Sequence, residues 1–87
     1  MEFEWDEAKR QANLAKHGLD FADAARLDWT SANVEPDRRF DYGEARFIAV
    51  GLLGDRLLAI AFTLRGTAVR VVSFRPASRK ERVRYGP

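Results

Sequence analysis

The 87-residue sequence contains no cysteine and only one histidine. The absence of cysteine excludes a disulfide scaffold, a zinc–thiolate site and a thiol nucleophile. A single histidine excludes a multi-histidine metal site and a catalytic pair of histidines. The longest apolar runs, 47–54 and 57–64, are far shorter than the ~18 residues that span a bilayer. The acidic start of the chain also lacks the basic and then apolar order of a signal peptide, so we expect a soluble, cytoplasmic protein with no membrane partner.

The composition that remains is that of one small folded domain, residues 1–87. About 46% of the residues are hydrophobic and 32% are charged, which is typical of a folded chain with one core. No glycine-rich phosphate loop is present, and no acidic residues show ligand spacing beside the histidine. We therefore expect neither a cofactor nor a metal.

The charges are distributed unevenly along the chain. Residues 1–44 contain six Lys or Arg against eleven Asp or Glu, a balance of −5, whereas residues 45–87 contain nine against two, a balance of +7. Twelve of the fifteen basic residues are arginine, whose planar guanidinium suits phosphate and carboxylate. The basic half indicates an anionic partner, either nucleic acid or an acidic protein surface. The alternative is that the two halves fold together and neutralise each other.

The sequence pattern predicts an α+β fold in the order β-α-α-β-β-β-α, with an antiparallel sheet packed by helices. Asp6 and Ser78 are expected to cap helices, Gly18 to end one, and Gly54-Asp55 to form a hairpin turn. Residues 30–44 are polar and turn-like and are predicted to be irregular. The expected strands are 3–5, 46–53, 56–64 and 68–74, and the expected helices are 7–17, 20–28 and 78–85.

The strand and helix between residues 65 and 85 hold the densest group of cations, with seven Lys or Arg and one acidic residue. A strand that ends in arginine and leads into a helix N-terminus is suited to phosphate, although a solvated basic face has the same pattern. Arg70 lies inside a valine-rich strand, so we expect it to have a carboxylate partner or a ligand. Arg70 and Arg75 differ in parity and would lie on opposite faces unless the strand bends or ends before Arg75.

Other residues suggest chemistry less strongly. His17 follows helix-forming residues and is favoured as part of a helix C-terminus, although, as the only histidine, it is also the obvious lone candidate for acid–base chemistry. Asp41, Glu44 and Arg46 suggest a surface ion-pair network. Phe3, Trp5, Phe21 and Trp29 are expected in the core, while Trp29 and Phe40 also suit base stacking or docking of a partner helix.

Several motifs, in order along nearly the whole chain, resemble the BrnT toxin family. The resemblance starts with Phe3-Glu4-Trp5-Asp6-Glu7-x-Lys9 and Lys16-His17-Gly18. It continues with Asp41-Tyr-Gly-Glu44-x-Arg46, Arg70-Val-Val-Ser73-x-Arg75-x-Ala77 and Lys80-Glu81-Arg82-x-x-Tyr85. Residues 30–40 match nothing in the family pattern, and Pro76 after Arg75 departs from it.

This resemblance implies a toxin of a type II toxin–antitoxin pair with a RelE-like ribonuclease fold. It implies a BrnA-like antitoxin with a ribbon-helix-helix part, in a heterotetramer of two toxins and two antitoxins. Operator DNA would be bound only through the antitoxin. The implied activity is endoribonucleolytic cleavage of RNA that arrests translation and growth.

A metal-independent ribonuclease of this kind needs a base, an acid and cations around the phosphate, and it releases a 2′,3′-cyclic phosphate. Arg70 and Arg75 are the expected phosphate clamp, assisted by Arg46 or Lys80. The candidates for proton transfer are His17, Glu44, Glu81 and Tyr85. The expected substrate-binding arginines are Arg46, Arg65, Arg79 and Arg82. The alternative functions are a non-catalytic RNA- or DNA-binding module and a protein-interaction subunit.

Overall fold

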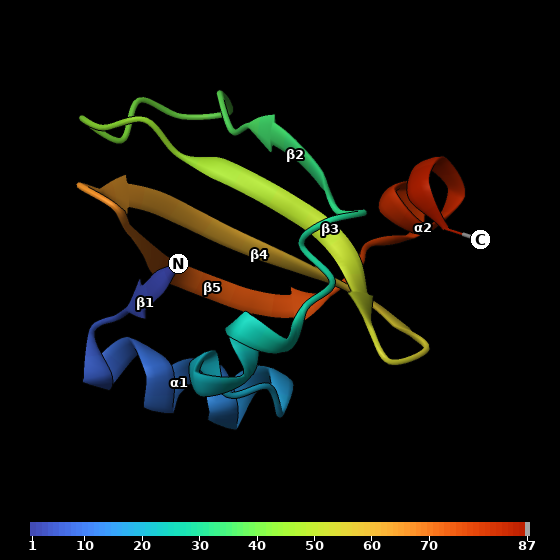
Figure 1. The fold of residues 1–87 in the computed structure, drawn as a ribbon, viewed down its shortest axis with the longest axis horizontal. Coiled ribbons are helices and arrows are strands. Elements are labelled where there is room, and N and C mark those ends of the chain that lie inside the picture. The colour runs from blue at the N-terminus through green and yellow to red at the C-terminus, as the bar shows by residue number, and fades with distance from the viewer. Residues whose placement is uncertain (87) are drawn as a thin grey trace.

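A twisted five-stranded sheet in the order β1-β5-β4-β3-β2 forms the centre of the computed structural model, which describes residues 1–86 (Figure 1). The strands are β1 (Glu2–Glu4), β2 (Asn33–Pro36), β3 (Phe47–Leu53), β4 (Arg56–Arg65) and β5 (Ala68–Pro76). The helices are α1 (Glu7–His17), the 3-10 helix η1 (Phe21–Arg26) and α2 (Arg79–Tyr85). None of the helices in the described part of the chain is long and apolar enough to cross a membrane.

The predicted helix signals are confirmed. The Asp6 carboxylate accepts a hydrogen bond from the Lys9 backbone N–H and caps α1, which ends at Gly18 with a left-handed φ of 70°. Ser78 and Glu81 form a reciprocal capping box at the start of α2. These signals depend on local hydrogen bonds, so they can be recognised in the sequence.

The α+β class is confirmed, but three details of the predicted topology are wrong. The segment predicted to be irregular contains β2, an edge strand with no buried residue and therefore no hydrophobic alternation to reveal it. The second helix is 3-10 rather than α. The sheet is mixed, because β1 pairs in parallel with β5 while the other neighbours are antiparallel.

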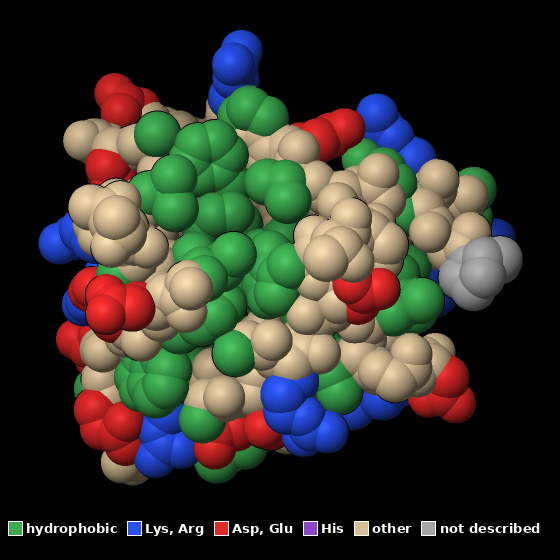
Figure 2. All heavy atoms as spheres, in the orientation of Figure 1, with side chains coloured by type: hydrophobic (Ala, Val, Ile, Leu, Met, Phe, Trp, Pro, Cys, Tyr) green, Lys and Arg blue, Asp and Glu red, His purple; other side chains and the backbone are tan. Residues whose placement is uncertain are grey.

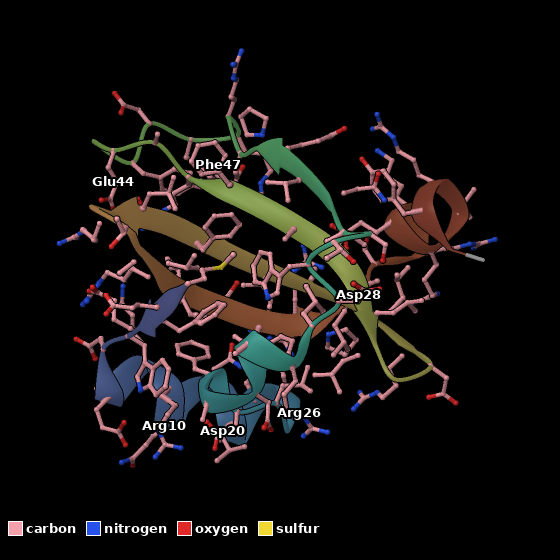
Figure 3. All side chains as sticks on the ribbon, viewed as in Figure 1. Arg10, Asp20, Arg26, Asp28, Glu44 and Phe47 are labelled. Atoms are coloured by element: carbon pink, nitrogen blue, oxygen red, sulfur yellow. The ribbon has the colours of Figure 1, made fainter. Side chains whose placement is uncertain are left out.

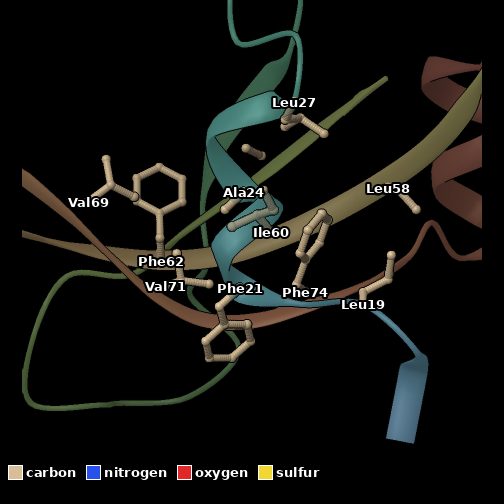
Figure 4. Packing of buried hydrophobic residues seen from close by; sticks show 11 residues of the cluster. Leu19, Phe21, Ala24, Leu27, Leu58, Ile60, Phe62, Val69, Val71 and Phe74 are labelled. Carbon is tan, nitrogen blue, oxygen red and sulfur yellow. The ribbon is translucent and has the colours of Figure 1, made fainter. Parts of the chain in front are cut away.

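The core lies between the sheet and the layer formed by α1 and η1 (Figure 4). Phe21 and Ala24 of η1 and Ile60 and Phe74 of the sheet are fully buried. Ile60 and Phe74 are register partners on β4 and β5, and both point to the face covered by Phe21 and Ala24, because side chains alternate between the two faces of a strand. The opposite face holds a smaller cluster, in which Ala77 and Tyr85 pack on Val50 and Ala59.

Buried Asn13 joins α1 to the free edge of β5. β1 pairs with β5 only from Ala68 to Arg70, so the backbone of Phe74 has no strand beside it on that edge. The Asn13 side chain donates to the Phe74 carbonyl (2.7 Å) and accepts from the Phe74 N–H (3.0 Å). It also donates to the Leu19 carbonyl at 3.0 Å. One side chain therefore satisfies backbone groups that would otherwise be buried without partners.

A β-bulge interrupts the pairing of β4 with β5. Ala61 pairs with Ser73, but its neighbour Phe62 pairs with Val71, so Val72 is an extra residue in β5. One extra residue reverses the alternation of side chains beyond it. The buried positions confirm the shift, because Val71 and Phe74 belong to the same core cluster although they are three residues apart.

Candidate functional site

The bulge places Arg70, Ser73 and Arg75 on one face of β5, the face turned away from the main core. The sequence parity predicted opposite faces for the two arginines only in a regular strand, and the extra residue Val72 makes β5 irregular and brings both to one face. On the neighbouring strand, Ala59 pairs with Arg75 and Ala61 pairs with Ser73. Small side chains therefore occupy the middle of this open face of the sheet, and Arg70 and Arg75 lie on either side of them.

Arg75 is anchored by Glu81 of α2. The guanidinium donates to both carboxylate oxygens, at 2.7 and 3.1 Å. Glu81 Oε1 also accepts from the Ser78 backbone N–H. The pKa of Glu81 lies below its usual value, and the main cause is the side-chain hydrogen bond from Arg75. The hydrogen bonds from Ser78 lower this pKa further, while burial opposes the shift. Glu81 is therefore ionised near neutral pH and holds the guanidinium in one place.

Arg70 has a carboxylate partner, one of the two alternatives that its position in the strand predicted. Its Nη1 atom lies 2.6 Å from Glu4 Oε2, and Glu4 is its register partner on β1. Both side chains are partly exposed, so the pair lies at the surface of the open face. The two candidate clamp arginines are thus each paired with an acidic residue of this chain.

A pocket of about 730 Å³ lies beside Arg75, between α2, the start of β3 and the chain that follows β2. Its floor includes Ile48 and Val50 of β3. The charged and aromatic residues of its wall are Glu35, Asp37, Arg38, Arg39, Arg75, Lys80, Glu81, Arg84 and Tyr85. Five of these are cations and three are carboxylates, so the pocket has an apolar floor and a net positive rim. An apolar floor suits a nucleobase, and a cationic rim suits phosphate.

Among the predicted site residues, the structure brings Arg75, Lys80, Glu81 and Tyr85 together in this pocket. Burial, as the main cause, and Glu35 raise the pKa of Tyr85, so its phenol stays protonated at neutral pH. Arg79 and Arg82 are exposed on α2, and Arg82 also donates to the Ala77 carbonyl. They flank the pocket without lining it.

His17, Glu44 and Arg65 lie elsewhere. His17 ends α1, on the helix that packs on the core side of β5. Figure 3 places Glu44 at the end of the sheet away from α2, and its carboxylate lies 3.6 Å from Arg65 Nη2. Neither His17 nor Glu44 lines the pocket beside Arg75, although both were predicted as candidates for proton transfer.

Arg46 does not join the ion-pair network expected with Asp41 and Glu44. Its guanidinium carbon lies 4.0 Å from the centre of the Tyr42 ring, and its Nε atom is buried without a hydrogen-bond partner. It lines a second hollow, of about 520 Å³, formed by residues 36–47.

Five charged residues of the main pocket were not predicted from the sequence: Glu35, Asp37, Arg38, Arg39 and Arg84. Arg38 and Arg39 follow β2, a strand that the sequence pattern did not predict, so their position beside the sheet could not be predicted either. Arg84 Nη2 reaches Glu35 Oε1 across the pocket at 3.2 Å. The adjacent Arg38-Arg39 pair was the only available signal in that segment, and its significance depends on the position of β2.

The core side of the sheet is incompletely covered. Figure 2 shows a contiguous hydrophobic patch over β3 and β4, beside η1. The aromatic rings of Phe3, Trp29, Phe62 and Phe47 follow one another there, with centroids 5.6 to 5.8 Å apart. Phe3, Trp29 and Phe47 are only half-buried, and Val34 of β2 is exposed. We call these rings and Val34 the aromatic patch.

The fold and site define a small α+β protein in which one sheet face is packed and the other bears a cationic pocket. A comparison with protein families matches residues 5–81 to the family described as the ribonuclease toxin BrnT of a type II toxin–antitoxin system. The chain belongs to this BrnT family of ribonuclease toxins.

Structure comparison agrees with that assignment. The chain is similar to the ribonuclease toxin BrnT of Brucella abortus, known from a crystal structure at 1.1 Å resolution, with 40% identity and a TM-score of 0.73. The match covers 91% of this chain and 99% of that one. A comparison with curated protein sequences finds no significant match.

Proposed function

We propose that this ribonuclease toxin cleaves RNA without a metal, in the pocket between α2 and the open sheet face, and leaves a 2′,3′-cyclic phosphate. The observation that carries the proposal is the convergence of Arg75, Lys80 and Tyr85 on one pocket with an apolar floor. In such a reaction the 2′-hydroxyl attacks the adjacent phosphorus and the 5′-oxygen leaves with a proton. Cations stabilise the charge that develops on the phosphate oxygens.

The pairing of Arg75 with Glu81 provides a role for both residues. A substrate phosphate that takes the Arg75 guanidinium withdraws it from the Glu81 carboxylate. Because Arg75 is the main cause of the lowered pKa of Glu81, that pKa then returns toward its ordinary value. Glu81 thereby becomes a better base to take the proton of the 2′-hydroxyl, and the protonated phenol of Tyr85 donates a proton to the 5′-oxygen as it leaves. Arg70, at the other end of the face, binds a neighbouring phosphate.

The test is incubation of the purified chain with long RNA in EDTA, with analysis of the fragment ends. We expect cyclic-phosphate ends from the wild type and intact RNA from Arg70→Ala/Arg75→Ala. The matched control is Arg26→Ala, which removes an exposed arginine from η1 on the other side of the sheet. RNA that stays intact with the wild type but is bound in a salt-sensitive way would favour the non-catalytic binding module instead.

Membership in a type II toxin–antitoxin family supports a protein antitoxin as partner. We propose a BrnA-like ribbon-helix-helix antitoxin, in a complex of two toxins and two antitoxins that acts in the cytoplasm and binds operator DNA through the antitoxin alone. We also propose that the toxin fold is RelE-like. The aromatic patch suits an amphipathic segment of such a partner, because it exposes apolar side chains that the described residues leave uncovered.

Co-expression with the candidate antitoxin tests the partner. We expect Trp29→Ala/Val34→Asp to lose co-purification of the antitoxin, and light scattering of the wild-type complex to give a mass of two plus two chains. Leu14→Ala, a change at an exposed leucine of α1, is the control. An intact complex with the double variant would move the contact away from the aromatic patch.

A further inference from the structure

We propose that the loop of residues 37–46 binds a nucleotide that flanks the cleavage site, with its base on Phe40 and its phosphate on Arg46. The ligand class is single-stranded RNA, and we call this second hollow the flanking subsite. The inference rests on the proposed function, because it extends the path of the same RNA beyond the main pocket.

The loop is held in shape before any ligand arrives. Asp37, whose side chain is only 3% exposed, accepts hydrogen bonds from Arg39 Nε at 2.9 Å and Arg39 Nη2 at 3.0 Å. It also accepts from the Tyr42 hydroxyl at 3.1 Å, while its backbone N–H donates to the Arg46 carbonyl. Thr63 of β4 donates to the Ala45 carbonyl and fixes the end of the loop to the sheet. A loop ordered in this way loses little conformational entropy on binding.

Arg46 is a cation held in place without an anion. Its guanidinium stacks on Tyr42, and its Nε atom is buried with no partner in the described part of the chain. No carboxylate of residues 1–86 lies within ion-pair distance of it. The buried Nε atom is closed to a ligand, so an arriving phosphate would be bound by the terminal nitrogens of this guanidinium, which make no ion pair within residues 1–86.

Phe40 supplies the apolar surface next to this cation. Its side chain is 68% exposed, and its ring meets the edge of Tyr42 with centroids 5.9 Å apart. Aromatic rings fixed in this way are the usual platforms for unpaired bases. The acidic groups nearby are Asp41, which accepts from the Gly43 N–H, and Glu44, which is engaged by Arg65.

The flanking subsite is continuous with the main pocket. Both hollows are lined by Pro36, Asp37, Arg38 and Arg39. A strand bound with its scissile phosphate at Arg75 can therefore pass over this shared wall and reach Phe40. An unpaired guanidinium beside an exposed ring fits a nucleotide better than an apolar protein segment, which would leave the cation unpaired.

The probe is a fluorescein-labelled hexaribonucleotide with 2′-O-methyl groups, which binds but lacks the attacking hydroxyl. We expect Phe40→Ala to weaken its binding by about five- to a hundred-fold, the range for the loss of one stacked base. Phe40→Tyr should bind like the wild type because it keeps the ring. Leu64→Ala, which shortens another exposed apolar residue, is the matched control and should also bind like the wild type.

Variants of Arg46 test the contribution of its charge to binding separately from the contribution of its shape. Arg46→Ala should weaken binding and reduce the slope of log K against log salt by about 0.7, the value for one phosphate contact on a single strand. Arg46→Lys should keep that slope because it keeps the charge. Circular dichroism of each variant confirms that the fold is retained.

Cleavage of natural RNA, with Arg75→Ala as its own control, is measured separately. If Phe40→Ala weakens hexamer binding while the wild type cuts no RNA, the flanking subsite is supported and the nuclease proposal fails. If the wild type cuts RNA and Phe40→Ala binds the hexamer as tightly as the wild type, the subsite is wrong. Unchanged hexamer binding together with loss of the co-purified antitoxin would make the loop a protein contact and would also overturn the proposal.

Discussion

Substitutions of polar residues that have several hydrogen-bond partners are expected to have the largest effects on the stability of this small protein. Asn13 satisfies backbone groups of β5 and of the turn after α1, and Asp37 organises a ten-residue loop from a nearly buried position. Each does so with one short side chain, which costs little rotamer entropy. Removing either leaves several donors and acceptors without partners, so these residues give the clearest tests at the residue scale.

Asn13→Ala should lower the free energy of unfolding by about 3 kcal/mol, because it leaves the Phe74 N–H and carbonyl buried without partners. For a domain of this size such a loss lowers Tm by more than about 10 °C. Thermal unfolding followed by circular dichroism measures it. The adjacent Leu14→Ala, on the exposed side of α1, should have little effect. Equal Tm values for the two variants would contradict the role of Asn13.

Asp37→Asn should lower the free energy of unfolding by about 2 kcal/mol at neutral pH, because the charge-assisted hydrogen bonds from Arg39 are lost. Arg39, as the main cause, lowers the pKa of Asp37 from 3.8 to about 2. A lowered pKa in the folded state means that the stabilisation is complete above pH 3.8 and is lost as the pH falls toward 2. Urea unfolding at pH 7 and at pH 2 should therefore show a gap between wild type and variant that closes in acid. A gap that stays constant would exclude the carboxylate as its source.

The short helices and strands of this protein are stabilised by capping groups, ion pairs and strand pairing rather than by a large number of residues. α2 has seven residues and no buried residue of its own, so its capping box and the Arg75–Glu81 pair hold it over the pocket. β5 is shaped by the extra residue Val72, which turns Ser73 and Arg75 to the open face. Both features place the candidate catalytic groups without contributing a large buried area.

Ser78→Ala should lower stability by about 1 kcal/mol, the usual value for loss of an N-cap. It should also loosen Glu81, whose backbone N–H donates to the Ser78 hydroxyl oxygen, and so reduce RNA cleavage. Ser78→Asp restores a capping carboxylate and should recover stability. Urea unfolding and the RNA assay report the two effects. Recovery of neither property by Ser78→Asp would show that the hydroxyl does more than cap the helix.

At the scale of the whole molecule, the uneven charge distribution is partly neutralised by folding. Three acidic residues of the first half pair with three arginines of the second, in the pairs Glu4–Arg70, Glu35–Arg84 and Glu44–Arg65. This pairing is the mutual neutralisation of the two halves that the uneven charge pattern left open as an alternative. Exposed pairs of this kind contribute little to stability. The cations left on and near the open face, including Arg46, Arg79 and Lys80, remain available to an anionic ligand.

RNA binding should therefore depend steeply on salt. If about four cations contact phosphates, log K should fall with log salt with a slope of about −3, so that binding weakens by more than about tenfold between 50 and 200 mM salt. Fluorescence anisotropy with the 2′-O-methyl hexamer measures the slope. A double variant of the open face, Arg75→Ala/Lys80→Ala, should reduce it, whereas Arg26→Ala on η1 should not. A slope near zero for the wild type would exclude phosphate contacts as the main source of affinity.

Local signals were sufficient for much of this protein. The α+β class, the helix caps at Asp6 and Ser78, the hairpin of β3 and β4 and a carboxylate partner for Arg70 all follow from residue spacing and from charge inside a strand. The motifs spread along the chain also indicated the BrnT family. Each of these depends on residues close in sequence or on a residue type placed where its neighbours restrict it.

The tertiary structure decided what depends on pairing between distant segments. The parallel partnership of β1 with β5, the exposed edge strand β2 and the bulge at Val72 have no local signature. The bulge in turn placed Arg75 with Lys80 and Tyr85 and left His17 on the other side of the sheet. The sequence determined which side chains carry the chemistry, but strand register determined which of them share a face, because one extra residue in β5 reverses every side chain after it.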